Sequence, residues 1–289
     1  MKKVKVKVPA KVNLTLDVLG LDGGYHSLKS FVASVDVFDT ITVKARRDGK
    51  ITLENRGLDV GCDITDNNAY KGAKSFIDTF GTCGVDIVID KKIPVGGGLG
   101  GSSADIAGVL NAMKELYGVK DDMHPLACSL GSDAPYMLKG GFAVMEGRGE
   151  KVESVNVDKK LYFIVITCDK IISARKCYQI FDEKKKMQKS TTDSAVKEMV
   201  KGDLKSALKH FKNDLQESAI ELVDEIKFNL FNLKKAGAEV AMVAGSGPSV
   251  LGIFEEITKR DNAFVALKGL YGKEILKAET IIKKEDKYI

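Results

Sequence analysis

The sequence lacks the residues that mark several classes of protein. It contains no tryptophan, three histidines and five cysteines in 289 residues. The cysteines are Cys62, Cys83, Cys128, Cys168 and Cys177. Because they are widely spaced and include no CxxC pair, they argue against a disulfide framework and against a structural zinc site. The histidines include no HExxH pair, which argues against a histidine-based metal centre as well.

Long apolar runs and an excess of one charge are missing too. No segment reaches the ~18 consecutive apolar residues that span a membrane, and the lysine-containing N-terminus lacks the apolar stretch of a signal peptide. The net charge of +5 is mild for this length, and no basic stripe is interleaved with aromatic residues. We therefore expect a cytoplasmic chain that binds neither membrane nor nucleic acid.

Apolar periodicity predicts a chain of mixed strands and helices. Alternation from Val4 to Val18 predicts one long strand, or a strand pair interrupted at Pro9, with Lys11 and Asn13 on the face away from the core. The continuous apolar run at 161–168 predicts a buried strand, and two or three helices follow between about residues 174 and 236. A linker near residues 153–160 predicts two domains, spanning 1–156 and 157–289.

The glycine-rich stretch PVGGGLGGSSAD, residues 94–105, follows a predicted strand and precedes a helical pattern. Glycine lets backbone N–H groups approach an anion, and a helix start adds unpaired N–H groups, so this order predicts a phosphate site. Ser102 and Ser103 stand where an N-cap is expected, and a hydroxyl there suits a metal ion. A flexible turn is the alternative. No lysine follows the glycines, which excludes a Walker loop, and the GxGxxG match at 96–101 lacks the acidic residue of a dinucleotide site.

Four motifs together resemble one family. The glycine-rich stretch resembles the phosphate-binding motif of the galactokinase, homoserine kinase, mevalonate kinase and phosphomevalonate kinase (GHMP) superfamily. PAKVNLTLDVLGLDGGYHSL (9–28) and LGSDAPYMLKGGFAVMEGRGE (130–150) resemble motifs of its 4-(cytidine 5'-diphospho)-2-C-methyl-D-erythritol kinase branch, and VAGSGPSVLGIF (243–254) resembles the third superfamily motif. The resemblance implies an α+β fold with two domains, the first like domain 2 of ribosomal protein S5 and the second a ferredoxin-like α/β domain.

The resemblance also implies roles for individual residues. Lys11 and Asp133 would be catalytic, although a strand lysine is ordinarily solvated and an aspartate before Ala-Pro ordinarily caps a helix. The implied substrate-binding residues are Asn13, Tyr25, His26 and Ser173. The implied ATP-binding residues are Pro94, Val95, Gly96, Gly97, Gly98, Leu99, Gly100, Gly101, Ser102, Ser103, Ala104 and Asn67, of which Asn67 could equally be a helix N-cap. Ser103 would face Mg²⁺, with Ser102 as the alternative because Gly101-Ser102-Ser103-Ala104 departs from the branch's three glycines before a serine pair.

The implied function is an ATP- and Mg²⁺-dependent kinase. It would phosphorylate the 2-hydroxyl of 4-(cytidine 5'-diphospho)-2-C-methyl-D-erythritol, a cytidine diphosphate-linked polyol, in non-mevalonate isoprenoid biosynthesis. Another superfamily kinase, of the homoserine or mevalonate type, and a non-catalytic ligand sensor are the alternatives. The DGGYH element (22–26) favours the first reading, because an aromatic ring can stack on a nucleobase. The chain is expected to be a monomer or a weak homodimer.

Overall fold

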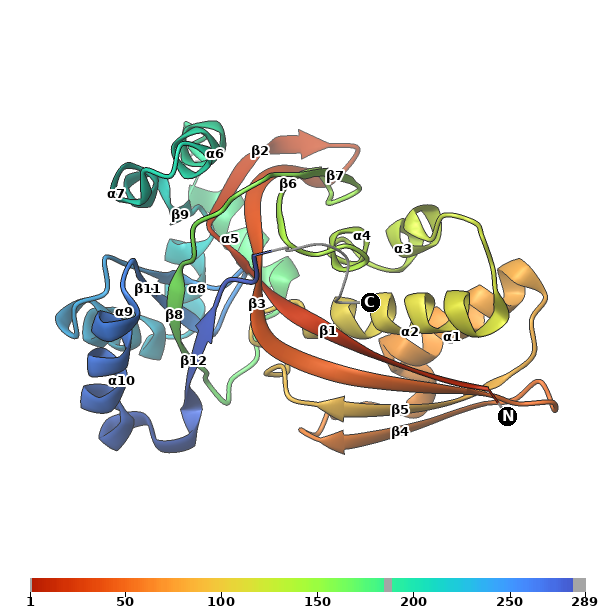
Figure 1. Cartoon of the computed structure of the whole chain (residues 1–289). Helices are drawn as coiled ribbons and strands as arrows, with labels where there is room; N and C mark the ends of the chain where they lie inside the picture. The colour runs from red at the N-terminus through yellow and green to blue at the C-terminus, as the bar shows by residue number, and fades with distance from the viewer. Residues whose placement is uncertain (1, 185–188, 283–289) are drawn as a thin grey trace.

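The computed structural model describes residues 2–184 and 189–282 in two sheets with helices packed on them (Figure 1). The first sheet contains β1 (Lys3–Asn13), β2 (Thr15–Asp22), β3 (Tyr25–Ala45), β4 (Ile51–Gly57), β5 (Val85–Lys91), β6 (Phe142–Gly147), β7 (Lys151–Ser154) and β9 (Lys212–Asn213). The second sheet contains β8 (Tyr162–Ile166), β10 (Val240–Val243), β11 (Val250–Phe254) and β12 (Ile275–Glu279). The helices are α1 (Asn68–Phe80), α2 (Gly101–Tyr117), α3 (His124–Leu130), α4 (Ala134–Met137), α5 (Ala174–Lys184), α6 (Thr192–Val200), α7 (Leu204–Ala207), α8 (Gln216–Leu222), α9 (Glu225–Lys235) and α10 (Ile257–Tyr271).

The long strand β3 organises the first sheet. It pairs antiparallel with β1, β2, β5 and β6, so strands from most of the N-terminal half meet on it. The predicted alternation is present at the start of β1, where valines are buried and lysines are exposed. The strand runs through Pro9 with a shift of register and ends at Asn13, so the predicted strand pair breaks at Leu14 instead of at the proline.

Both faces of β8 are buried, as its continuous apolar run predicts. Phe163 and Val165 pack into a core shared with the first sheet, whereas Ile164 and Ile166 pack into a second core beneath the C-terminal helices. A strand between two cores has no solvent face, so its sequence shows no alternation. The change from one sheet to the other falls between β7 and β8, at the predicted linker, but β9 from the C-terminal half joins the first sheet next to β2. The division into domains 1–156 and 157–289 stays a prediction.

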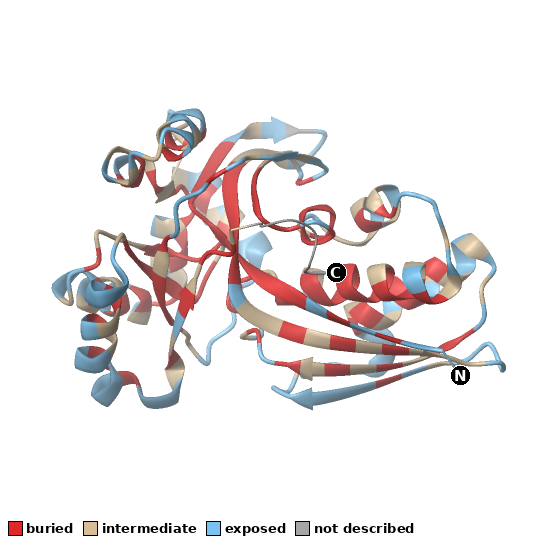
Figure 2. Cartoon of the chain, in the orientation of Figure 1, coloured by how far each residue is buried: buried red, intermediate tan, exposed pale blue. Residues whose placement is uncertain are grey.

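The helices form layers on the two sheets. In Figure 1, α1 and α2 lie along one face of the first sheet, and α9 and α10 lie on the outer side of the second sheet. Figure 2 shows that buried residues are concentrated on the sheets and on the helix surfaces that face them. Between residues 174 and 236 the described chain forms five helices, where two or three were predicted, because turns near Gly202 and Val223 and the short strand β9 interrupt the helical pattern.

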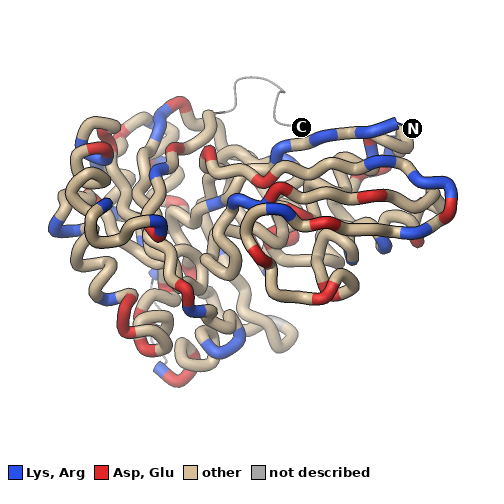
Figure 3. The backbone as a smooth tube through the Cα atoms, turned by 90° about the horizontal axis from the view of Figure 1, so that it is seen from below, with Lys and Arg blue, Asp and Glu red and all other residues tan. Residues whose placement is uncertain are grey.

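Charge is spread over the whole molecule. Figure 3 shows acidic and basic residues interspersed along both halves of the backbone, in keeping with the mild net charge of +5. None of the helices in the described part of the chain combines the length and the apolar content needed to cross a membrane.

Candidate active site between the two sheets

The glycine-rich stretch joins the end of β5 to the start of α2. The helix begins at Gly101, and Gly100 occupies the N-cap position with a left-handed backbone (φ 74°). The prediction that Ser102 or Ser103 caps this helix is wrong. Both serines lie in its first turn, because glycine adopts the left-handed cap conformation without a steric cost. The N–H groups of this turn have no intrahelical partner, so the helix start offers donors and a partial positive charge to an anion.

Close contacts account for glycines in this stretch. Gly98 has a φ of +78°, and a Cβ atom there would lie 1.9 Å from the carbonyl oxygen of Ala244 in the second half of the chain. At Gly100 a Cβ atom would lie 2.4 Å from Met137 Cε and 2.9 Å from Lys11 Cγ. At Gly98 and Gly100 the loop backbone packs so closely against neighbouring residues that a side chain would not fit, and this packing fixes the path of the loop.

A cavity of about 350 Å³ opens beside the loop. Its lining includes Lys11, Asn67, residues 94–103, Asp105 and Asp133 from the first half, and Ile172 and residues 245–247 from the second. This volume lies within the range of small-molecule sites, roughly 300–1,000 Å³. Of the serines, Ser102 is exposed and Ser103 is partly buried, while Ala104 is fully buried in the core.

Lys11 and Asp133 meet at the wall of this cavity. Lys11 Nζ lies 3.2 Å from Asp133 Oδ2, although the two residues are far apart in the sequence. The Lys11 side chain is 5% exposed and the Asp133 side chain 32% exposed, so the ammonium is enclosed and the carboxylate reaches the cavity. Asp133 stands at the N-cap of α4 but makes no side-chain capping hydrogen bond, which removes the ordinary role of such an aspartate.

Asn13 lies beside Lys11, two residues further along β1. Lys11 Nζ donates to Asn13 Oδ1 at 2.7 Å, and Asn13 Nδ2 donates to Ser30 Oγ at 2.7 Å. Lys11 and Asn13 are each 4% exposed, so the face that the sequence places away from the core is covered. The backbone N–H of Lys11 also donates to the carbonyl of Leu99 at 3.0 Å, which ties the strand to the glycine-rich loop.

Asn67 is the N-cap of α1. Its Oδ1 accepts a hydrogen bond from the N–H of Ala69 at 2.9 Å, so it caps α1. It also lines the cavity, together with its neighbour Asn68. The cap holds the start of α1 against the cavity wall, and Asn67 as an ATP contact stays a prediction.

A buried cluster of charged side chains contacts the first turn of α2. Lys91 Nζ lies 2.6 Å from carboxylate oxygens of both Asp39 and Asp105, and it donates to the carbonyl of Gly101 at 3.1 Å. Burial raises the pKa of the Asp105 carboxyl to about 7; the Lys91 ammonium opposes this rise and the Asp39 carboxylate adds to it. The other carboxylate oxygen of Asp105, Oδ1, is buried without a hydrogen-bond partner among the described residues. Sequence reasoning missed this cluster.

Tyr25 and His26 begin β3, and their rings have different partners. The guanidinium of Arg148 lies 3.6 Å from the centroid of the half-exposed Tyr25 ring. The His26 ring stacks on Tyr178 of α5 with centroids 4.5 Å apart, and its Nε2 donates to Asp182 at 2.7 Å. The predicted pair thus lies beside two aromatic or cationic partners, Arg148 and Tyr178, that sequence reasoning missed.

The environment of Tyr178 changes its acidity. Burial, with a smaller contribution from the Asp133 carboxylate, raises the pKa of the Tyr178 phenol. Ser173 is exposed in the turn before α5, and its neighbour Ile172 reaches the cavity lining. The role of Ser173 in substrate binding stays a prediction.

No cluster of three or more histidine, cysteine, aspartate or glutamate side chains in residues 2–184 and 189–282 could hold a metal ion by itself. The oxygens nearest to such a role line the cavity: the Ser103 hydroxyl and the unpartnered Asp105 Oδ1. Carboxylate and hydroxyl oxygens are the donors that Mg²⁺ prefers, and beside a nucleotide this ion takes most of its ligands from phosphate and water.

Comparison with known proteins gives one consistent result. The sequence profile of the GHMP kinases N terminal domain matches residues 67–142. The chain is 32% identical over 283 residues to 4-diphosphocytidyl-2-C-methyl-D-erythritol kinase of Clostridium beijerinckii, covering 96% of this chain and 100% of the relative. A crystal structure of 4-(cytidine 5'-diphospho)-2C-methyl-D-erythritol kinase superimposes with a TM-score of 0.81 at 26% identity, covering 96% and 98% of the two chains. Homoserine kinase from Cytophaga hutchinsonii shares the fold, with a TM-score of 0.75 at 19% identity over 99% and 96% of the chains.

Proposed function

The chain belongs to the 4-diphosphocytidyl-2-C-methyl-D-erythritol kinase family of the GHMP kinases, and from this premise we propose that it transfers the γ-phosphoryl group of ATP to the 2-hydroxyl of 4-(cytidine 5'-diphospho)-2-C-methyl-D-erythritol. Membership makes it an ATP-dependent small-molecule kinase with the predicted α+β GHMP kinase fold. The acceptor, its place in the non-mevalonate route to isoprenoid precursors and the residue roles are the proposal. The ion pair between Lys11 and Asp133 at the cavity wall is the observation that carries it.

Residues 94–103, Lys11 and Asp133 each have a different role in the proposed reaction. The triphosphate lies along residues 94–103, where the free N–H groups of the first turn of α2 face its charge. Asp133 accepts or orients the proton of the acceptor hydroxyl, while the Lys11 ammonium neutralises the charge that develops on the transferring phosphoryl group. The hydroxyl oxygen forms a bond to the γ-phosphorus as the bond to the β–γ bridging oxygen breaks, and ADP leaves. Such a transfer depends mainly on position and charge, which a buried, tightly held lysine supplies.

Mg²⁺ fits the oxygens that this site presents. Ser103, and Asp105 through its unpartnered oxygen, would hold the ion or its water shell, and Ser102 is the alternative serine. When bound, the ion neutralises phosphate charge. Beside a nucleotide such an ion would take most of its ligands from phosphate and water.

The nucleobase end of the acceptor would lie against the rings of Tyr25, His26 and Tyr178. A tyrosine ring offers a flat apolar face of the size of a cytosine, and His26 offers a ring nitrogen for its polar edge. In this arrangement an acceptor with a base at one end and a hydroxyl at the other would extend from the stacked rings of His26 and Tyr178 to Asp133.

An acceptor panel tests this function. ADP release from ATP is measured with the cytidine diphosphate-linked polyol, homoserine and mevalonate, and the phosphorylated product is identified by mass spectrometry. We expect turnover with the first acceptor, and a loss of about 10²–10⁴-fold in kcat for Asp133→Asn. Asp122→Asn is the matched control, because this exposed aspartate also precedes a short helix and accepts only from the N–H of His124. Turnover with homoserine or mevalonate alone would refute the proposed acceptor, and full activity of Asp133→Asn would refute its role.

A further inference from the structure

The side-chain amide of Asn13 can be placed in two ways. Its oxygen and nitrogen have nearly the same size, but the oxygen only accepts hydrogen bonds and the NH₂ group only donates them. The Lys11 ammonium also only donates. The pair at 2.7 Å is therefore attractive only when Asn13 Oδ1 faces Lys11. With the amide reversed, donors would oppose donors in a place where both residues are 4% exposed and water cannot relieve the conflict.

Ser30 decides between these two orientations. Its hydroxyl lies 2.5 Å from the carbonyl oxygen of Thr15 and 2.7 Å from Asn13 Nδ2. A carbonyl oxygen cannot donate, so the single hydroxyl proton of Ser30 must point to Thr15. Toward Asn13, Ser30 then has only lone pairs, and Asn13 must turn its NH₂ group to Ser30 and its oxygen to Lys11.

Thr15 is held in turn from the other half of the chain. Its hydroxyl accepts from the N–H of Phe31 at 2.9 Å and lies 2.6 Å from the hydroxyl of Thr192, at the start of α6. The Thr192 hydroxyl also lies 2.6 Å from Asp17 Oδ2, which as a carboxylate accepts only. Thr192 thus donates to Asp17, and Thr15 donates to Thr192.

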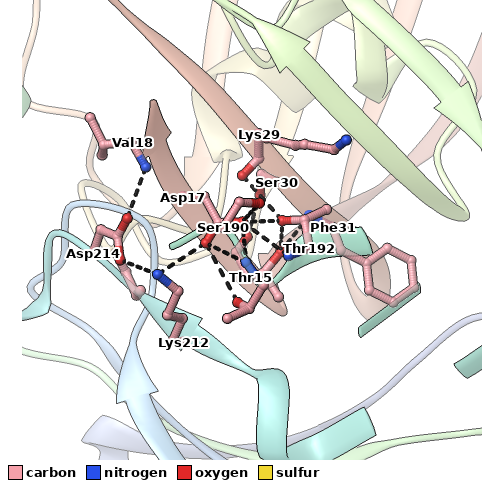
Figure 4. Close-up of polar contacts among 12 residues, drawn as sticks. Thr15, Asp17, Val18, Lys29, Ser30, Phe31, Ser190, Thr192, Lys212 and Asp214 are labelled. Carbon is pink, nitrogen blue, oxygen red and sulfur yellow. Dashed lines mark hydrogen bonds and ion pairs between the residues drawn. The ribbon is translucent and has the colours of Figure 1, made fainter. Parts of the chain in front are cut away.

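The network consists of two runs of hydrogen bonds that meet at Thr15. In the first, Lys11 donates to Asn13, Asn13 donates to Ser30, and Ser30 donates to the backbone carbonyl of Thr15. In the second, the side-chain hydroxyl of Thr15 donates to Thr192, and Thr192 donates to the Asp17 carboxylate. Figure 4 shows the part of this network that contains Thr15, Thr192 and Asp17. Each side chain is buried, and hydrogen bonds that share one direction strengthen one another.

We propose that Ser30 is a positioning residue of the kinase site: its hydroxyl sets the orientation of the Asn13 amide, whose oxygen holds the Lys11 ammonium beside Asp133. This inference rests on the proposed function, in which Lys11 acts on the transferring phosphoryl group. Ser30 touches neither the lysine nor the cavity lining, so it acts only through Asn13. Through Thr15 and Thr192, the C-terminal half takes part in positioning a catalytic side chain of the N-terminal half.

The test is the Ser30→Ala variant of the full chain. It removes the Ser30 oxygen that accepts from the Asn13 NH₂ group, so the amide is no longer held on the side opposite Lys11. We expect kcat to fall about 10- to 100-fold, the range produced by small misplacements of a catalytic group. The KM for ATP should not change, because Ser30 does not line the cavity beside residues 94–103. Ser30→Thr keeps the hydroxyl on a strand position that suits threonine and should restore most of kcat. In an Asn13→Ala background, Ser30→Ala should cost nothing more, since the residue it acts through is absent.

A second variant separates positioning from stability. Thr280→Val also removes a buried hydroxyl, which accepts from the N–H of Leu161 at 2.9 Å away from the site. Both variants should lower the midpoint of urea denaturation, but only Ser30→Ala should lower kcat. An unchanged kcat for Ser30→Ala, or equal and additive losses in the Asn13→Ala background, would overturn the inference while leaving the proposed function intact.

A crystal structure of Ser30→Ala gives a readout that does not depend on activity. We expect Lys11 Nζ to leave Asn13 Oδ1. If the wild-type chain phosphorylates none of the acceptors, the proposed function fails, and this structure still decides whether Ser30 places the lysine. An unmoved Lys11–Asn13 pair would overturn the inference in that case as well.

Discussion

Asp17 allows a prediction whose size follows from its contacts. The residue lies on β2, is fully buried, and its carboxylate accepts from Ser190 Oγ at 2.7 Å, from the N–H groups of Thr191 and Thr192 at 3.0 Å each, and from Thr192 Oγ1 at 2.6 Å. Lys212 Nζ, on β9, adds an ion pair at 3.2 Å. Thr191, the residue at the N-cap of α6, makes no capping bond of its own, so a carboxylate from another strand stabilises this helix start (Figure 4).

The perturbation is Asp17→Asn, which preserves shape and removes the charge. The asparagine oxygen can replace the carboxylate oxygen that faces Thr192, but its NH₂ group then opposes the donors on the other side, Thr191 and Lys212. Lys212 keeps a second partner, Asp214 at 2.7 Å, so the lysine is not left alone. We therefore expect a loss of about 2–4 kcal/mol in the free energy of unfolding, between the value of one charged hydrogen bond and that of a broken buried ion pair.

Urea denaturation followed by circular dichroism measures this loss, first at pH 7 and then in steps to pH 2.5. Burial alone would raise the pKa of Asp17, but hydrogen bonds from Thr192, Ser190 and Lys212 together hold it below the ordinary value of 3.8. A folded-state pKa below the unfolded one contributes stability above about pH 4, and this contribution disappears as the pH falls through the folded value. The gap between wild type and Asp17→Asn should thus stay constant above about pH 5 and close below pH 4.

Two results would refute this reasoning about Asp17. One is a loss below about 0.5 kcal/mol at pH 7, the level of an ordinary surface substitution. The other is a gap that does not change in acid. Asp203→Asn is the control, because this exposed residue caps α7 through the N–H of Ser206 at 3.0 Å and asparagine caps equally well, so its denaturation midpoint should match wild type.

Two further predictions concern the loop and the nucleobase end of the site. Gly98→Ala should lower the denaturation midpoint more than Gly96→Ala: both glycines have positive φ, but only the first substitution drives a Cβ against a backbone carbonyl, that of Ala244, whereas the second meets side-chain atoms of Ile171 at 3.6 Å. Equal losses would mean that backbone conformation alone requires these glycines. Arg148→Ala should raise the KM for the nucleotide-linked acceptor several-fold and leave the KM for ATP unchanged, because it removes the cation that packs against the ring of Tyr25. Steady-state kinetics, with each substrate varied in turn, measures both constants. An equal rise in both KM values would mean that Arg148 serves only the fold.

Local patterns predicted much of the fold. The buried strand β8 and the strand β5 lie where apolar runs place them, and Gly23 and Gly24 have the positive φ values that glycine allows in a turn. These features depend on neighbours in the sequence, so periodicity and glycine content report them. The N-cap of α2 was predicted at Ser102 or Ser103, because serine is a common N-cap residue. The residue that occupies this position is Gly100, which the sequence pattern does not distinguish from the glycines beside it.

The side chains that support the site could not be found in this way. Lys91 meets Asp39 across 52 positions, and Thr192 meets Asp17 across 175, so no spacing in the sequence connects them. The alternation around Lys11 predicts a face away from the core, but it does not show whether solvent or another part of the chain, here the glycine-rich loop and Asp133, covers that face. Motif resemblance named Lys11 and Asp133 as a pair, whereas their approach to 3.2 Å depends on the packing of β1 against the loop and α4.

The glycines of the loop at residues 94–103 are explained partly by the sequence pattern and partly by packing in the fold. From the sequence, the glycines suggest freedom that a phosphate would use. In the fold, Gly97 lies against Ser249 and Gly98 lies against Ala244, both in the β10–β11 turn. A Cβ atom on Gly98 would clash with the carbonyl oxygen of Ala244, so no other residue fits there. The flexibility of the unfolded chain is therefore lost on folding, before any ligand arrives. A loop ordered in this way presents its N–H groups in fixed positions. In the proposed function ATP would therefore meet donors already oriented for the triphosphate, and the contact between the two sheets would help to orient them.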